Sequence, residues 1–198
     1  VVKPKDRPVI CTICGDSGMG KTSLAATFPK PIFVRAEDGM QSISEAVRPD
    51  AFPMITDLES MRNQFIALLT EEHDYKTMVI DSVTKLESMF INHVVDSDPK
   101  KPKSINQALG GYGAGLAAVA ALHASVRKAA GALNERRGMN VVFIAHADTE
   151  TIELPDEDPY MRYSLRLGKR SVAPYVDESD VVGFLKLETF TKESDKGK

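Results

Sequence analysis

The amino-acid sequence predicts an α/β fold, with a mostly parallel central sheet, helices on both faces, and β-hairpins or edge strands near the C-terminus. Short apolar runs alternate along the chain with segments of helical periodicity. The runs lack polar alternation, which is typical of strands buried on both faces. The composition, 42% hydrophobic and 27% charged residues, is ordinary for a globular protein.

The apolar runs and their flanking residues predict the following elements. Strands are expected at residues 9–14, 32–34, 51–55, 77–80 and 140–145, with an edge strand at 181–187. The alternation after residue 147 predicts β-hairpins, with an acidic tip at 153–159. Helices are expected at 21–28, 58–69, 83–95 and 112–137, and a loop at 96–111. Asp57 is the expected N-cap of the second helix.

These elements make one domain at residues 9–190, after a short extension at 1–8 and before a charged, frayed tail at 191–198. There is no run of eighteen apolar residues and no secretory signal, so we expect a cytoplasmic protein without a membrane partner. The net charge of −3 means that nucleic-acid binding would depend on local basic patches. Cys11 and Cys14 lie on one expected strand with their side chains on opposite faces, so we interpret them as buried core residues.

One motif carries the chemistry. Residues 15–22, GDSGMGKT, match G-x-x-x-x-G-K-[ST] in full, after an expected strand and before an expected helix. Backbone amides of such a loop surround phosphate oxygens, its lysine reaches the outer phosphates, and its hydroxyl is a ligand of Mg²⁺. The motif predicts ATP and Mg²⁺ as cofactors, with these nucleotide-binding residues: Gly15, Asp16, Ser17, Gly18, Met19, Gly20, Lys21, Thr22 and Ser23.

Three further polar residues follow the expected strands. The carboxyl ends of parallel strands meet at one edge of a sheet, where ligands bind. Asp81 is the expected metal-linked acid beside Thr22, although it or Ser82 could instead cap the next helix. Glu37 is a candidate to activate water, in competition with Asp38, and His146 is a candidate hydrogen-bond donor to the terminal phosphate.

Four segments in order, the motif, IFVRAEDG, MVIDSVTKLE and VVFIAHADTE, resemble the ATPase core of the RecA family of recombinases over residues 8–188. More narrowly, they resemble small phage-encoded ATP-binding proteins, some of which anneal single strands. The resemblance implies that Glu37 activates water, that Asp81 is the Mg²⁺-associated acid, and that Lys21 and His146 complete the catalytic set. His146 stands where this family usually has a glutamine that senses the γ-phosphate.

The resemblance also implies partners. Two loops would bind single-stranded DNA, at residues 100–112 and 147–162, with candidate contacts from Lys100, Lys101, Lys103, Tyr112 and Arg162. A homo-oligomer, as a ring or a filament, is expected, in which Lys169 or Arg170 reaches a neighbour's phosphates. A single-strand binding protein is a further expected partner, and a phage-encoded protein would act in the bacterial host.

The leading hypothesis is therefore a DNA-stimulated ATPase acting on single-stranded DNA in phage recombination or annealing. Two alternatives stay open. One is a P-loop kinase for a small molecule, although the sequence has no clear arginine-rich lid. The other is a structural module that binds nucleotide without hydrolysing it.

Overall fold

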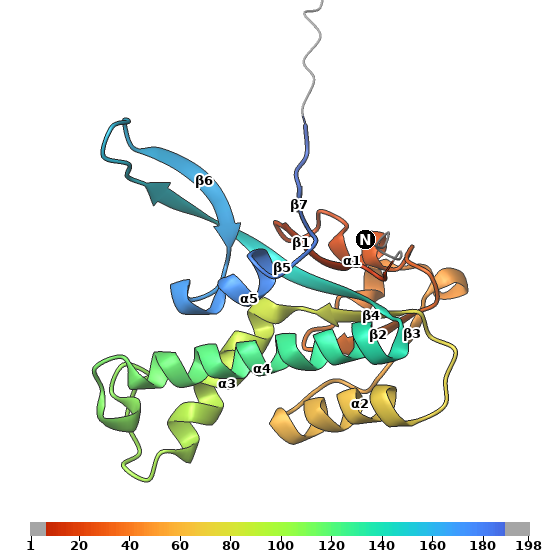
Figure 1. Cartoon of the computed structure of the whole chain (residues 1–198), viewed down its shortest axis with the longest axis horizontal. Coiled ribbons are helices and arrows are strands. Elements are labelled where there is room, and N and C mark those ends of the chain that lie inside the picture. The colour runs from red at the N-terminus through yellow and green to blue at the C-terminus, as the bar shows by residue number, and fades with distance from the viewer. Residues whose placement is uncertain (1–6, 189–198) are drawn as a thin grey trace, which may run out of the picture.

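The computed structural model describes residues 7–188 as a seven-stranded sheet with helices on both faces (Figure 1). The main sheet has the order β3-β2-β4-β5-β1-β7 with every pair parallel, and β6 pairs antiparallel with β5. Most of the extension and the charged tail expected at 191–198 lie outside the described residues. The strands are β1 (Ile10–Gly15), β2 (Pro31–Arg35), β3 (Asp50–Ala51), β4 (Thr77–Asp81), β5 (Asn140–Ile152), β6 (Tyr160–Leu165) and β7 (Val181–Leu185).

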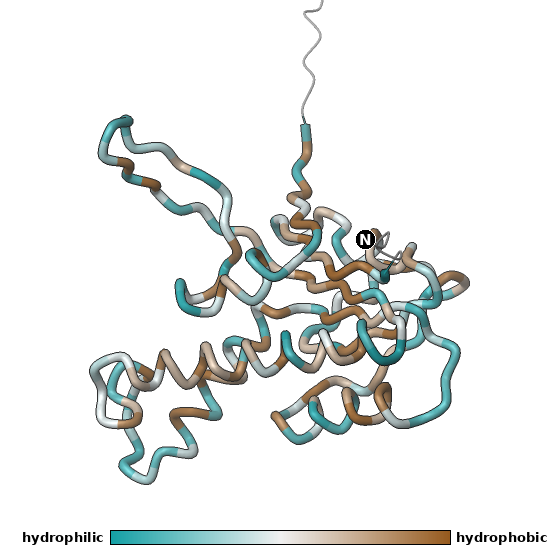
Figure 2. The backbone as a smooth tube through the Cα atoms, viewed as in Figure 1, coloured by the Kyte–Doolittle hydropathy of each residue, from teal (hydrophilic) through white to brown (hydrophobic). Residues whose placement is uncertain are grey.

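The core is divided between the two faces of the sheet, and the central strands are apolar along their length (Figure 2). Successive strand residues belong to different clusters, as expected for strands covered on both faces. Cys14 lies in the cluster beneath the longer helices and Cys11 in the cluster beneath the first helix, and both are buried, free thiols. Their interpretation as core residues on opposite faces is confirmed.

The helices are α1 (Lys21–Ala25), α2 (Leu58–Thr70), α3 (Val83–Ser97), α4 (Ala114–Arg137) and α5 (Ala173–Val176). The Asp57 carboxylate accepts a hydrogen bond from Ser60 N at 2.7 Å, which confirms it as the N-cap of α2. Ser82 is the N-cap of α3, so Asp81 is left free for another role. None of the helices among residues 7–188 is long and apolar enough to cross a membrane.

Four expectations about element boundaries were wrong. The strand expected to end before His146 continues to Ile152, because β6 supplies new ladder partners after the main sheet ends. The strand expected at 51–55 is the two-residue β3, and the helix expected at 21–28 is α-helical only to Ala25. Residues 166–180 contain a 3-10 turn (Lys169–Ser171) and α5 where hairpins were expected.

Candidate functional site

The phosphate-loop motif lies between β1 and α1 (Figure 1). Gly18 and Gly20 have φ angles of +79° and +85°, which side-chain-bearing residues rarely adopt. A Cβ atom at either glycine would meet no atom within 4 Å, so the requirement for glycine comes from the backbone and the space above the loop is open. These two glycines therefore shape a loop whose inner surface is accessible to a ligand.

Lys21 is only 7% exposed, at the first position of α1. Its Nζ atom donates to the carbonyl oxygens of Gly15 at 2.9 Å and Asp16 at 2.7 Å. Burial lowers the pKa of Lys21, while the carboxylates of Asp81 and Glu37 act to raise it. The lysine is thus held beneath the loop with its charge directed at the cavity.

Thr22 and Asp81 form the second part of the site. The Thr22 hydroxyl donates to Asp81 Oδ2 at 2.8 Å, and Asp81 is 2% exposed. Burial raises the pKa of Asp81 to about 6, against the lowering effect of the Thr22 hydrogen bond. A Cβ atom on Gly39 would lie 2.8 Å from Asp81 Oδ2 and 2.9 Å from Thr22 Oγ1, so the absence of a side chain at Gly39 keeps this pair accessible.

Glu37 and His146 form the third part. His146 Nε2 lies 3.0 Å from Glu37 Oε1, and both side chains are largely buried. Burial acts to raise the pKa of Glu37, but hydrogen bonds from Ser82 and His146 outweigh it, so the pKa lies below its ordinary value. Asp38, the competing carboxylate, instead lies 3.7 Å from the guanidinium of Arg35.

A cavity of about 390 Å³ joins the three parts. A larger cavity of about 580 Å³ lies between α2 and α3 but contains none of the motif residues. Gly39 and Ser42 were not expected in the site, whereas Asp38 was named only as the competitor of Glu37; the sequence signal near them is the polar cluster that follows β2. The residues that line the smaller cavity are Ser17, Gly18, Gly20, Lys21, Thr22, Ser23, Glu37, Asp38, Gly39, Ser42, Asp81 and His146.

Three of the expected nucleotide-binding residues do not line this cavity. Gly15 is buried in the sheet, and a Cβ atom there would lie 2.7 Å from the carbonyl oxygen of Leu185. Its glycine is therefore required for packing against β7. Asp16 contributes its carbonyl to Lys21, and the Met19 side chain is half-buried.

The donor set fits a magnesium nucleotide. Mg²⁺ prefers oxygen ligands, and Thr22 and Asp81 present a hydroxyl and a carboxylate oxygen to the same space. Burial disfavours the charged form of Asp81 and is the main cause of its raised pKa. A cation bound beside this carboxylate would stabilise its charged form. Gly18, Gly20 and Lys21 line the same cavity, where backbone amides and the lysine charge suit phosphate oxygens.

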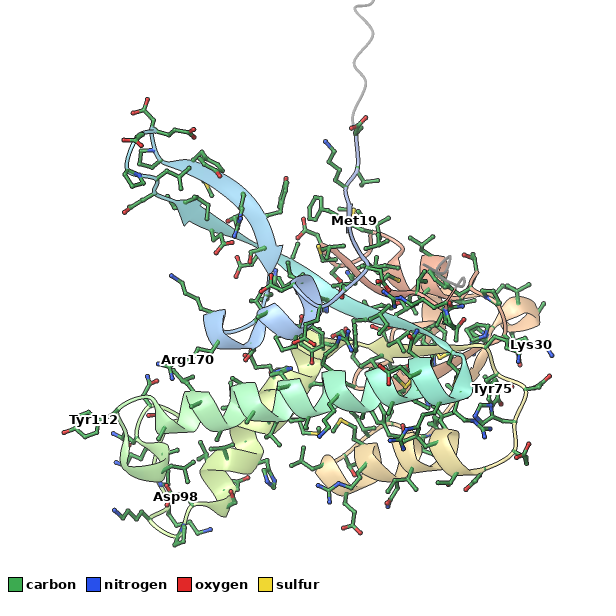
Figure 3. All side chains as sticks on the ribbon, viewed as in Figure 1. Met19, Lys30, Tyr75, Asp98, Tyr112 and Arg170 are labelled. Atoms are coloured by element: carbon green, nitrogen blue, oxygen red, sulfur yellow. The ribbon has the colours of Figure 1, made fainter. Side chains whose placement is uncertain are left out.

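The residues expected to bind DNA lie away from the cavity. Lys100, Lys101 and Lys103 lie in the loop between α3 and α4, and Tyr112 is fully exposed and points away from the body (Figure 3). Arg162, on β6, instead forms an ion pair with Glu150 at 2.8 Å.

Neither residue expected to act in trans lines the cavity of its own chain. Arg170 NH1 donates to the Gly113 carbonyl at 3.2 Å. Lys169 lines a separate cavity beside the β5–β6 hairpin and has no hydrogen bond or ion pair with any residue in 7–188. Lys169 is therefore the freer of the two candidates.

Comparison with known proteins places the chain in a family. A family model described as an AAA domain matches residues 7–198. A prophage-derived relative, the uncharacterized SPbeta protein YorG of Bacillus subtilis (strain 168), is 25% identical over 178 residues. The match covers 89% of this chain and 50% of that protein, so the chain spans half the length of this relative. The parallel sheet, the phosphate loop and the family match agree, and the chain belongs to the AAA domain family of P-loop ATPases.

Proposed function

We propose that this chain is a Mg²⁺-dependent ATPase in which Glu37 activates the attacking water. One observation carries the proposal: residues at the ends of β1, β2 and β4 and within β5 converge on the cavity above the phosphate loop. Lys21 and Thr22 come from the start of α1, which follows the loop after β1, while Glu37 follows β2 and Asp81 ends β4. His146 completes the set from β5.

Each residue has a distinct task in hydrolysis. Glu37, whose lowered pKa keeps it ionised at neutral pH, accepts a proton as the water oxygen bonds to the terminal phosphorus and the bond to the ADP oxygen breaks. Lys21 balances negative charge on the phosphates. Mg²⁺ bound by Thr22 and Asp81 would supply further charge neutralisation. The Glu37–His146 hydrogen bond orients the carboxylate, and turning His146 towards the terminal phosphate would release Glu37 for the water.

The charges around the cavity support an oligomer. Three carboxylates and one lysine line it, so one chain gives a polyphosphate little positive charge. A basic side chain from a neighbouring copy would add positive charge beside the phosphates, as in other ATPases whose active site is completed by a second protein. We assign this role to Lys169 in a ring or filament of copies, since Arg170 is already bound to Gly113.

Single-stranded DNA is the proposed polymer partner. The loop of Lys100, Lys101 and Lys103 is basic, and Tyr112 beside it presents a fully exposed ring for base stacking. Residues 147–165 instead contain six carboxylates and one arginine, which Glu150 neutralises, so we leave Arg162 and the hairpin out of the DNA surface. The prophage origin of the relative supports a role in phage recombination or annealing in the host, where a single-strand binding protein would be a partner.

The test measures ATP turnover with and without an oligo(dT) strand. Single-stranded DNA is expected to raise the rate, and phosphate is expected to appear in water and not on a small acceptor. Replacing Lys100, Lys101 and Lys103 together by alanine should weaken DNA binding and lower the slope of log K against log salt by about two. The control Arg162→Ala should leave the DNA affinity and its salt dependence unchanged. Equal DNA affinity in the triple variant would contradict the assigned surface.

A further inference from the structure

We infer that Thr84 is a positioning residue for the Glu37–His146 pair, an inference that rests on the proposed ATPase function. The backbone N–H of His146 donates to Thr84 Oγ1 at 3.0 Å. Thr84 lies in the first turn of α3, whereas His146 lies on β5, which follows α4 in the chain. Thr84 is not among the residues that line the cavity, so we infer that it acts through His146.

The need for Thr84 arises where the β4–β5 ladder stops. The last pair of that ladder is Asp81 with Ile144, after which the chain of β4 turns into α3. His146 lies two residues further along β5, where β4 has no backbone acceptor left to offer. A buried N–H group without a partner is costly, and the Thr84 hydroxyl supplies the missing acceptor.

The backbone carbonyl of His146 also has a hydrogen-bond partner. It accepts a hydrogen bond from Arg166 N at 2.8 Å, in the segment that follows β6. On the other side, His146 is paired in register with Gly15 of β1. The backbone of His146 is therefore fixed between β1 and α3, which sets the direction in which its imidazole leaves the strand towards Glu37.

The first turn of α3 thus arranges three parts of the site at once. Asp81 directly precedes its N-cap, Ser82 caps the helix and acts to lower the pKa of Glu37, and Thr84 accepts a hydrogen bond from His146. A rigid helix turn keeps these groups at fixed separations. Small displacements of reacting groups lower catalytic rates strongly, so loss of the Thr84 acceptor should affect turnover more than nucleotide binding.

The experiment compares Thr84→Val, which keeps the side-chain shape but removes the acceptor, with Thr84→Ser, which keeps the acceptor. Thr70→Val is the matched control, because Thr70 has an exposed hydroxyl on α2 that bonds only within its own helix. We expect kcat of Thr84→Val to fall by about tenfold, with nucleotide affinity unchanged within about twofold. Thr84→Ser and Thr70→Val should resemble the wild type.

A second measurement is independent of turnover. The chain has four histidines, so the imidazole nitrogen signals can be assigned by NMR in the nucleotide-free protein. Thr84→Val should shift the His146 signals in the direction produced by Glu37→Gln, and Thr84→Ser should not. Unchanged His146 signals in Thr84→Val would overturn the inference, and so would a loss of nucleotide affinity as large as the loss of kcat.

Glu37→Gln also separates the two proposals. Full turnover in Glu37→Gln would remove the proposed role of Glu37, while the NMR comparison would still decide whether Thr84 positions His146. Loss of turnover in Glu37→Gln together with wild-type turnover and His146 signals in Thr84→Val would remove the inference about Thr84 alone.

Discussion

His146 Nε2 lies 3.0 Å from Glu37 Oε1, although 109 residues separate the two along the chain. The contact joins β5 to the turn that follows β2, across the strand β4 that lies between them in the sheet. It also forms where the β5–β6 hairpin begins. A change in the partner of His146 therefore has a direct structural route to the hairpin.

The first prediction concerns this hydrogen bond. His146→Ala removes one of the two side-chain hydrogen bonds that lower the pKa of Glu37, so that pKa should rise. His146→Gln keeps a donor and should preserve more of the effect. The acidic limb of the pH dependence of kcat/KM for ATP measures this difference. The limb should move to higher pH in the alanine variant and less in the glutamine variant, and identical limbs in all three proteins would contradict the assignment.

Gly39 provides a steric prediction. Its φ angle of −84° is open to any residue, so alanine adds no backbone strain there. The added Cβ would nevertheless lie within 2.9 Å of both Thr22 Oγ1 and Asp81 Oδ2. We expect Gly39→Ala to weaken magnesium-nucleotide affinity by about tenfold or more, roughly the cost of one lost charge-assisted contact. Titration of a fluorescent ATP analogue with Mg²⁺ measures it.

The matched control is Gly131→Ala on α4. An added Cβ there has one close neighbour, the guanidinium of Arg127, at 3.2 Å. Alanine favours a helix over glycine, so this variant should be as stable as the wild type or more stable by up to about 1 kcal/mol. Its nucleotide affinity should not change. Equal losses of affinity in both variants would rule out the local clash as the cause.

His123 predicts how stability depends on pH. The side chain is fully buried, its Nδ1 atom lies 2.7 Å from the Tyr175 hydroxyl, and its Nε2 atom has no hydrogen-bond partner among the described residues. Burial lowers the pKa of His123 from 6.5 to about 4. The unfolded chain therefore binds this proton first as the pH falls, and the free energy of unfolding should decrease between pH 6.5 and about 4.

The loss attributable to His123 is about 3 kcal/mol across that window. Urea unfolding of the wild type and of His123→Gln at several pH values isolates it, because glutamine does not titrate. His123→Gln should be less stable than the wild type at pH 7. The difference between their free energies of unfolding should become smaller as the pH falls towards 4. If that difference is the same at every pH, His123 is not the cause of the loss of stability.

Much of the site was visible in the sequence because its signals are local. Residues 15–22 form a contiguous motif, and Asp81 ends a short apolar run that predicts a buried strand. The Asp57 cap was visible for the same reason, since it directly precedes an amphipathic pattern. The sequence also predicts that Glu37 and His146 lie at the same edge of the sheet, because the carboxyl ends of parallel strands meet there.

The remainder depends on contacts between distant segments. The continuation of β5 beyond His146 requires β6 as a partner, and nothing within residues 140–145 indicates where that partner begins. The requirement for glycine at Gly15 comes from Leu185 on β7, and the role of Thr84 appears only where one ladder ends beside a helix. Gly39 likewise has no signal in the sequence beyond its polar neighbours.

In the proposed mechanism Glu37, held by His146 at the cavity edge, activates the water that hydrolyses ATP. Measuring single-turnover ATP hydrolysis and ATP affinity for Glu37→Gln, beside Asp38→Asn as the neighbouring control, tests it most directly. We expect Glu37→Gln to lose turnover by about a hundredfold or more with affinity nearly unchanged, while Asp38→Asn retains turnover. Wild-type turnover in Glu37→Gln, or loss of turnover in Asp38→Asn alone, would contradict it.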